Sequence, residues 1–264
     1  MAAYEVRALN TATRSENAMH HDDVATRYGF RGGLVPGVDV YAYLTHPAAE
    51  RWGLPWLERG RMRGRFLQPV YDGDTVRVVA TDEGGGELAL EVRDEDGGLC
   101  ATGRAWLPDE PPPDVDASAW QEVDQPAPED RPPPGPGTLA PGTALGLRSH
   151  RFDSSEAEAY LADVREALPL YAQERIAHPG WLLRDANWVL SRSVHLGPWI
   201  HVESDVQHLG VVRDGQEVGC RATVNREWEH KGHRFVELDV LLLAGDRPVF
   251  DPPERHVGRG PPVQ

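Results

Sequence analysis

The sequence contains 264 residues, 40% of them hydrophobic and 26% charged, which is ordinary for a globular protein and leaves one large domain or two modest domains open. The formal net charge of -15 argues against binding to nucleic acid or to an anionic membrane, because either surface would repel the chain. The only cysteines, Cys100 and Cys220, argue against a disulfide scaffold, and their spacing is not that of metal ligands.

Membrane insertion and export are also disfavoured by the sequence. No apolar run comes close to the roughly 20 residues that span a bilayer. The N-terminus lacks the basic and then apolar pattern of a signal peptide. We therefore expect a soluble, cytoplasmic protein that requires no metal and no cofactor.

The first half is predicted to consist of a short strand, one helix and a run of further strands. The short strand lies at residues 4–9. The helix extends from Val38 to about Trp52, after Pro36 and Gly37, which favour a helix start. It has to be enclosed, because residues 38–44 are apolar on most faces. Alternating apolar and polar positions then predict strands at residues 63–69, 75–81, 87–93 and 99–107.

Four arginines, Arg59, Arg61, Arg63 and Arg65, occur at every second position before and within the first of these strands. On an extended strand this spacing puts all four guanidinium groups on one face, where they could grip a phosphate-bearing ligand such as coenzyme A. A solvated strand edge is the alternative interpretation. We name Arg63 and Arg65 as candidate substrate-binding residues, together with Tyr41 of the helix.

A proline-rich segment divides the chain. Eleven of the 23 prolines fall between Pro108 and Pro141, among acidic residues and glycine. Such a composition cannot bury enough apolar surface to fold by itself. We therefore predict an N-terminal domain at residues 1–108, a linker without regular secondary structure at residues 109–140, and a C-terminal domain at residues 141–264.

The second half repeats the order of elements found in the first. Tyr28 corresponds to Tyr171, and the Pro36-Gly37 pair corresponds to Pro179-Gly180, at one constant offset. We expect a second buried helix from Trp181 to about Ser193, with a short strand at 147–152 before the helix. Further strands are expected after it at residues 201–208, 217–224 and 234–243 and near residue 248.

A repeated unit of one apolar helix and an antiparallel meander is most simply closed by wrapping the sheet around the helix. We therefore predict an α+β fold of the double hot-dog type, in which two such sheets join edge to edge in one chain. Joining the sheets removes an exposed edge from each. The two helices are then related by a pseudo-twofold axis, and the protein is a monomer with pseudo-dimeric halves or a homodimer.

A motif lies between the first strand and the first helix. Residues 15–22 read Ser-Glu-Asn-Ala-Met-His-His-Asp, and residues 28–37 read Tyr-Gly-Phe-Arg-Gly-Gly-Leu-Val-Pro-Gly. This segment resembles the signature of the MaoC-like hydratase family, Asp-x-Asn-Pro-Leu-His-x-Asp followed by Phe-x-x-x-Ile-Ala-His-Gly. The matching positions are Asn17, His20, Asp22, Phe30, Leu34 and Gly37.

The resemblance implies reversible addition of water across the double bond of an enoyl thioester of coenzyme A or an acyl carrier protein. In the family an Asp and a His handle the proton of water, and His20 matches that His. The thioester carbonyl would accept hydrogen bonds from backbone N–H groups near Gly37, at the positive end of the helix. Two positions depart from the signature: Ser15 replaces the catalytic Asp and Pro36 replaces the second His.

The predicted catalytic residues are His20, Ser15 and Asn17. His20 is the acid or base, since its pKa is normally near neutral, and Ser15 positions water or substrate without supplying charge. The alternatives are that His20 only hydrogen-bonds its loop, and that Ser15 and Asn17 only form turns or helix caps.

The second half has no counterpart of His20, because the corresponding place falls in residues 162–164. We expect this half to complete the pocket rather than to carry chemistry. Trp181, Trp188 and Trp199 cluster around its helix and are either core residues or the wall of a binding channel. Trp181 is our candidate for substrate binding.

Three functions remain open from the sequence. The first is a lyase of the hydratase or dehydratase type. The second is another hot-dog reaction that needs one base, such as thioester hydrolysis or an addition or cyclisation in secondary metabolism, which the serine at position 15 favours. The third is a non-catalytic acyl-binding protein, which the absence of a duplicated catalytic residue favours.

Overall fold

The computed structural model describes residues 4–112, 114–135, 137–251 and 256–262. The first half contains one long buried helix, α2, which begins at Gly37 and ends at Trp52. The other elements of this half are β1 (Tyr4–Arg7), the 3-10 helix η1 (Ala18–His20), α1 (Asp22–Arg27), α3 (Leu54–Arg59), β2 (Arg61–Phe66), β3 (Thr75–Gly84), β4 (Glu87–Arg93) and β5 (Leu99–Trp106).

The second half is built in the same way around α6 (Pro179–Ser193), which follows His178. The Nδ1 atom of His178 accepts a hydrogen bond from the backbone N–H of Gly180 and so caps the helix. The other elements are β6 (Ala144–Arg151), α4 (Ser154–Asp163), α5 (Leu170–Glu174), β7 (Ile200–His208), β8 (Glu217–His230), β9 (His233–Ala244), β10 (Arg247–Asp251) and β11 (His256–Pro262).

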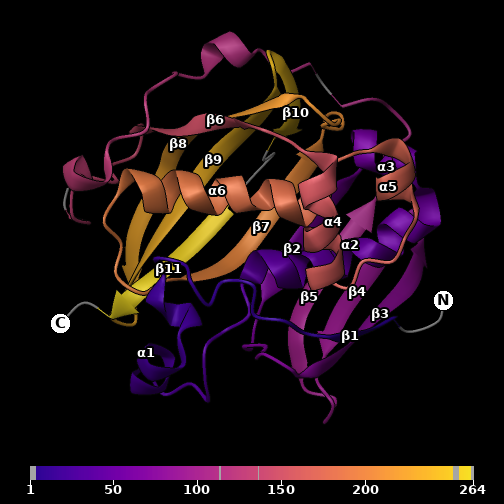
Figure 1. Cartoon of the computed structure of the whole chain (residues 1–264), viewed down its shortest axis with the longest axis horizontal. Coiled ribbons are helices and arrows are strands. Elements are labelled where there is room, and N and C mark those ends of the chain that lie inside the picture. Colours follow the sequence, from indigo (N-terminus) through magenta and orange to yellow (C-terminus); the bar gives the residue numbers. More distant parts are fainter. Residues whose placement is uncertain (1–3, 113, 136, 252–255, 263–264) are drawn as a thin grey trace.

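The described strands form one sheet of eleven strands, in the order β1-β3-β4-β5-β2-β7-β10-β9-β8-β6, and β11 pairs with β7 and β9. The two halves join where β2 pairs with β7, antiparallel, from Arg61 opposite Gln207 to Arg65 opposite Glu203. Figure 1 shows α6 lying across the face formed by the strands of the second half, with α2 beside the strands of the first. The predicted edge-to-edge junction and the enclosed helix in each half are confirmed.

Two strand predictions need correction. The hairpin of β8 and β9 is longer than expected, because polar residues after Val224 continue the pairing as far as His230 opposite His233. Among the arginines, Arg59 is not part of a strand: it ends α3 and donates a hydrogen bond to the carbonyl of Pro108. Gly60 separates that helix from β2, so the arginine stripe of the strand begins at Arg61.

The segment between β5 and β6 contains, among its described residues, only the two short 3-10 helices Ala117–Ala119 and Pro128–Asp130. The segment is held against the second half by an arginine of β8. Arg221 donates hydrogen bonds to the carbonyl of Ala117 and to the carboxylate of Glu122. The domain boundaries at residues 108 and 141 stay predictions. Among the described helices, none is long and apolar enough to cross a membrane.

The two central helices touch where α6 begins. A Cβ atom added to Gly180 would lie 2.7 Å from the Cβ of Ala42 and 3.1 Å from the carbonyl oxygen of Val38, and it would also meet the hydroxyl of Tyr160. Backbone and buried side chains surround this point, so a larger residue can be accommodated only by moving one helix.

We expect Gly180→Val to destabilise the fold by about 1–3 kcal/mol, the usual cost of overpacking a filled core. Gly219→Val is the matched control, because a Cβ there would meet Leu243 at 3.7 Å, an ordinary contact distance. Urea denaturation of both variants measures the difference. Equal stabilities would show that α2 and α6 are not tightly packed at Gly180.

Candidate active site

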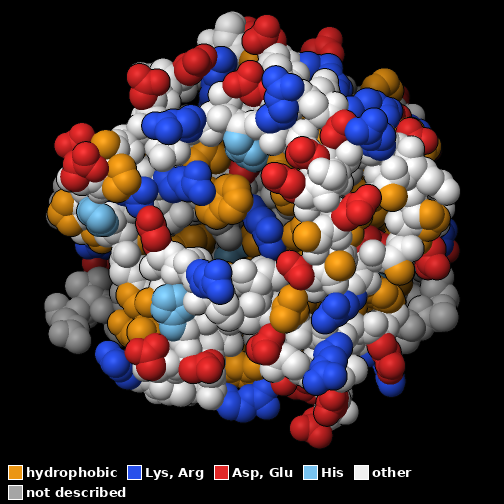
Figure 2. Space-filling model, viewed as in Figure 1, with side chains coloured by type: hydrophobic (Ala, Val, Ile, Leu, Met, Phe, Trp, Pro, Cys, Tyr) orange, Lys and Arg blue, Asp and Glu red, His pale blue; other side chains and the backbone are white. Residues whose placement is uncertain are grey.

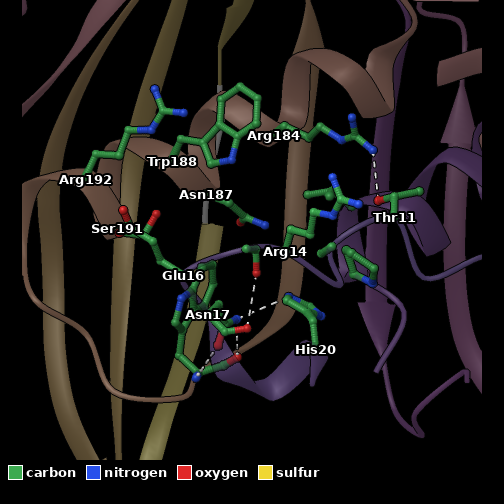
Figure 3. Close-up of a pocket in the computed structure, with 15 residues that line it drawn as sticks. Thr11, Arg14, Glu16, Asn17, His20, Arg184, Asn187, Trp188, Ser191 and Arg192 are labelled. Carbon is green, nitrogen blue, oxygen red and sulfur yellow. Dashed lines mark hydrogen bonds between the residues drawn. The ribbon is translucent and has the colours of Figure 1, made fainter. Parts of the chain in front are cut away.

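A cavity of about 400 Å³ lies between the two halves. The first half contributes the loop that contains Ser15 and His20, and the second half contributes one face of α6 together with Trp199. Figure 2 shows a hollow near the middle of this face of the molecule, with basic and hydrophobic side chains around it. Figure 3 shows the side chains that surround the cavity. Its wall also includes Pro36 and Val38 at the start of α2.

A second, smaller cavity of about 30 Å³ adjoins the first. The two share Asn17, His20 and Trp199 in their walls, and the smaller one is also lined by Gly37, the first residue of α2. Backbone N–H groups in the first turn of a helix have no acceptor within the helix. The histidine and the positive end of a 16-residue helix therefore border the same space.

The hydrogen bonds of His20 assign its tautomer. Its Nδ1 lies 2.7 Å from the carbonyl oxygen of Leu34, which can only accept, so Nδ1 carries the proton. Its Nε2 lies 3.3 Å from the amide nitrogen of Asn17, which donates, so Nε2 presents a lone pair. Figure 3 shows this contact between the two side chains. At 3.3 Å the hydrogen bond is long, and a water molecule can compete for the lone pair.

Burial lowers the pKa of His20 below 6.5, its ordinary value, and the hydrogen bond to the carbonyl of Leu34 opposes part of that effect. The imidazole is therefore neutral at pH 7, the form that acts as a base.

Asn17 is held by the second half of the chain. Its amide nitrogen donates to the carbonyl of Trp199 at 2.9 Å, and its side-chain oxygen accepts from the N–H of Trp199 at 3.2 Å. The same oxygen accepts from the N–H of Met19 at 3.2 Å and caps η1. Because these contacts fix the amide, its remaining N–H is directed at His20.

Ser15 lines the cavity but has no direct contact with the histidine ring among the hydrogen bonds of the described residues. Its hydroxyl donates to the carbonyl of Asn17 at 3.2 Å. A serine at this position therefore supports the loop and brings no charge to the cavity.

Asp39 is a buried carboxylate next to the cavity. Its side chain is 0% exposed, and it accepts hydrogen bonds from Thr11 at 2.5 Å and from Nη2 of Arg184 at 3.1 Å. Burial raises the pKa of Asp39, whereas the charge of Arg184 and the hydroxyl of Thr11 oppose the rise. The Arg184 guanidinium also lies 4.3 Å above the ring of Tyr160. The pair of Asp39 and Arg184 connects α2 to α6 at the cavity wall.

Two further arginines line the cavity, Arg14 and Arg192. The guanidinium of Arg192 lies 4.7 Å from the centre of the Trp188 ring, which holds it at the wall. The one acidic residue of this lining, Glu16, is paired at 2.6 Å with Arg131, a buried arginine of the proline-rich segment. That segment therefore fixes the outer edge of the site.

The structure brings His20, Ser15, Asn17 and Gly37 together, but it places the other predicted site residues elsewhere. Tyr41 is fully buried on α2, with its ring against Gly64. Trp181 packs edge-on against the ring of Phe152 and does not line either cavity.

The strand arginines also lie outside both cavities. Arg61 and Arg63 both contact the carboxylate of Asp205 on β7, and Arg65 lies 4.0 Å from that of Glu203. These three arginines thus face two carboxylates across the junction between the halves. A phosphate would have to compete with these carboxylates.

Of the α6 residues at the cavity, the sequence pointed only to Trp188, as either a core residue or the wall of a channel. The α6 residues of the wall are Arg184, Asn187, Trp188, Ser191 and Arg192, which recur at helical spacing and so share one face. The signal in the sequence that could have identified the others is a stripe of polar residues along a helix that is otherwise buried. Within the described part of the chain, no group of three or more His, Cys, Asp and Glu side chains could hold a metal ion.

Solved structures with the same architecture are numerous. One described as a MaoC domain protein dehydratase, from Chloroflexus aurantiacus J-10-fl, has a TM-score of 0.62 at 11% identity, covering 99% of this chain and 94% of the other. A double hotdog protein from Mycobacterium tuberculosis has a TM-score of 0.59 at 15% identity, with 97% and 95% covered. One described as an oleoyl thioesterase, from Lactobacillus plantarum, has a TM-score of 0.50 at 13% identity, with 99% and 96% covered.

No family model and no curated protein sequence matches this chain. At such low identities the similarity establishes the fold and leaves the reaction open. The chain has the α+β double hot-dog fold that the sequence predicted, the fold also found in MaoC-like dehydratases.

Proposed function

We propose that the protein is a lyase of the hydratase or dehydratase type, acting on an acyl thioester of coenzyme A or an acyl carrier protein. The observation that carries the proposal is the neutral His20, whose lone pair on Nε2 lies at a cavity that adjoins the start of α2. The fold supports it, since a structure described as a MaoC domain dehydratase is built in the same way.

In the hydration direction, Nε2 of His20 takes a proton from a water molecule as the water oxygen bonds to the β-carbon of the enoyl group. The electron pair of the carbon–carbon double bond moves to the α-carbon and the thioester carbonyl. The imidazolium then returns its proton to the α-carbon, which completes the addition of water. A single histidine can carry both transfers, because it passes through both protonation states near neutral pH.

The negative charge that develops on the thioester oxygen has to be stabilised by hydrogen-bond donors. The N–H groups of Gly37 and Val38 lie in the first turn of α2, and both residues line the cavities. Donors fixed in this way stabilise a developing oxyanion without having to reorganise. In this scheme Ser15 supplies no charge, and its hydroxyl orients water.

Thioester hydrolysis is the second candidate. It is favoured by the serine at position 15, because hydrolysis needs one base and no paired carboxylate. His20 would take a proton from water as the water oxygen bonds to the thioester carbonyl carbon, the C–S bond would break, and the imidazolium would return the proton to the departing sulfur. A structure described as an oleoyl thioesterase has a related architecture.

The products separate these reactions. We expect the purified protein to consume crotonyl-coenzyme A with loss of the enoyl absorbance and without release of thiol, and to catalyse the reverse reaction with hydroxybutyryl-coenzyme A. Release of one thiol for each thioester consumed would instead assign hydrolysis. If a series of enoyl and saturated acyl thioesters, short and long, gives neither product above the uncatalysed rate, both enzymatic functions are wrong.

A further inference from the structure

We propose that the cavity selects an acyl group that itself carries a carboxylate, and that Arg14 and Arg192 bind that carboxylate. The inference rests on the proposed function only in taking the ligand to be an acyl thioester. It names the substrate class of the same site: a dicarboxylic acyl unit attached through one of its carboxyl groups to the thiol.

The charge of the cavity wall carries the argument. The wall includes three arginines, Arg14, Arg184 and Arg192, in a chain whose formal net charge is -15. Its one acidic residue is already paired with Arg131. The imidazole of His20 is neutral and so does not change the charge of the wall. The wall is thus positive in an acidic protein, which favours an anionic ligand.

The three arginines differ in the interaction partners that they already have. Arg184 is committed to Asp39 and Thr11. For Arg14 and Arg192, no hydrogen bond or ion pair to a carboxylate is found among the residues that the structure describes. The guanidinium of Arg192 stacks on the ring of Trp188, and its charge also acts, without a hydrogen bond, on the buried carboxylate of Asp185. Stacking on that ring leaves the edge of the guanidinium free to donate two parallel hydrogen bonds. Trp188 therefore prepositions a binding group for a carboxylate.

The position of these arginines distinguishes a carboxylate on the acyl group from a phosphate of coenzyme A. Both arginines line the cavity that contains His20, which has a volume of about 400 Å³. In coenzyme A the whole pantetheine arm separates the phosphates from the sulfur. A phosphate seated in this cavity would leave the thioester outside it, away from the histidine. An acyl carboxylate satisfies the arginines while the thioester stays at His20.

Binding can be measured without turnover by using two thioethers of N-acetylcysteamine as probes. One carries a carboxypropyl group on its sulfur and the other a butyl group, and neither can be hydrated or hydrolysed or contains phosphate. By isothermal titration calorimetry we expect the carboxypropyl probe to bind about tenfold more tightly, the scale of a hydrogen bond between charged groups. Raising the salt concentration should reduce this preference.

The double variant Arg14→Gln/Arg192→Gln should bind both probes within about twofold of each other, and the single variants show how the two arginines share the effect. Arg148→Gln is the control, since this exposed arginine of β6 lies outside the cavity, and it should keep the wild-type preference.

Equal binding of the two probes by the wild type, or no measurable binding of either, overturns the proposal. It is also wrong if the double variant keeps the preference, or if it weakens binding of coenzyme A while binding of the carboxypropyl probe is unchanged, which would assign the arginines to phosphates. Because no probe reacts, these outcomes are independent of the hydration assay. A protein that hydrates crotonyl-coenzyme A without preferring the charged probe keeps its proposed function and loses only this inference.

Discussion

His20→Ala is expected to lower kcat/KM for hydration of an enoyl thioester by about a hundredfold or more, which is the usual contribution of a general base. The side chain removed is the neutral imidazole between Leu34 and Asn17. Substrate affinity should change little, because the cavity wall formed by α6 is untouched. The measurement is steady-state kinetics at neutral pH with the loss of the enoyl absorbance.

Two controls make this result specific to proton transfer. Ser15→Ala removes one neutral hydrogen bond, to the carbonyl of Asn17, and should cost much less, about 0.5–1.5 kcal/mol in the activation free energy. In the wild type, kcat/KM should fall on the acid side with a midpoint below pH 6.5, because burial lowers the pKa of His20. If His20→Ala and wild type turn over every thioester equally, His20 is not the base.

Arg184→Met is expected to destabilise the protein by about 3–5 kcal/mol, the usual penalty for removing one partner of a buried ion pair. The reason is Asp39, whose carboxylate is 0% exposed and would keep only the hydroxyl of Thr11. Arg77→Met is the control, since its pair with Glu5 is 58% exposed on both sides and should contribute at most about 1 kcal/mol. Chemical denaturation followed by fluorescence measures both.

The pH dependence of that loss has a definite sign. Burial holds the pKa of Asp39 above its ordinary value in the folded protein, so the folded state binds a proton more tightly than the unfolded chain does. The destabilisation is therefore present above the folded pKa and is relieved as the pH falls through it. Arg184→Met/Asp39→Asn should recover most of the stability, because no buried charge remains. A loss that the second substitution leaves unchanged would mean that the packing of the arginine stem, and not the charge, is what matters.

Much of the fold could be predicted from local sequence signals. The offset between Pro36-Gly37 and Pro179-Gly180 placed both central helices, because proline is favoured at the start of a helix and apolar segments follow both pairs. Strand alternation placed most of the meander. The β8–β9 hairpin was underestimated, since its outer part is polar and is specified by pairing with the neighbouring strand and not by burial.

The sequence pointed to cavity-lining residues as far as they were contiguous in the chain. His20, Ser15 and Asn17 lie in one loop, so a motif could identify them. The opposite wall comes from α6, and nothing in a single sequence states which face of a distant helix will meet that loop. Trp181 was predicted to bind substrate, but Trp188 lines the cavity. The two lie about two turns apart on the same side of the helix, so only the assembled sheet decides which one reaches the cavity.

The junction of β2 with β7 joins two halves of one chain that contribute different residues to the cavity. In a symmetric dimer any substitution would appear twice, once beside each histidine. Here a substitution on α6 changes one wall of the cavity and leaves the residues of the loop that contains His20 as they were. Under the proposed function, selectivity and chemistry can thus be altered separately, which makes the stripe from Asn187 to Arg192 the place to redesign what this protein accepts.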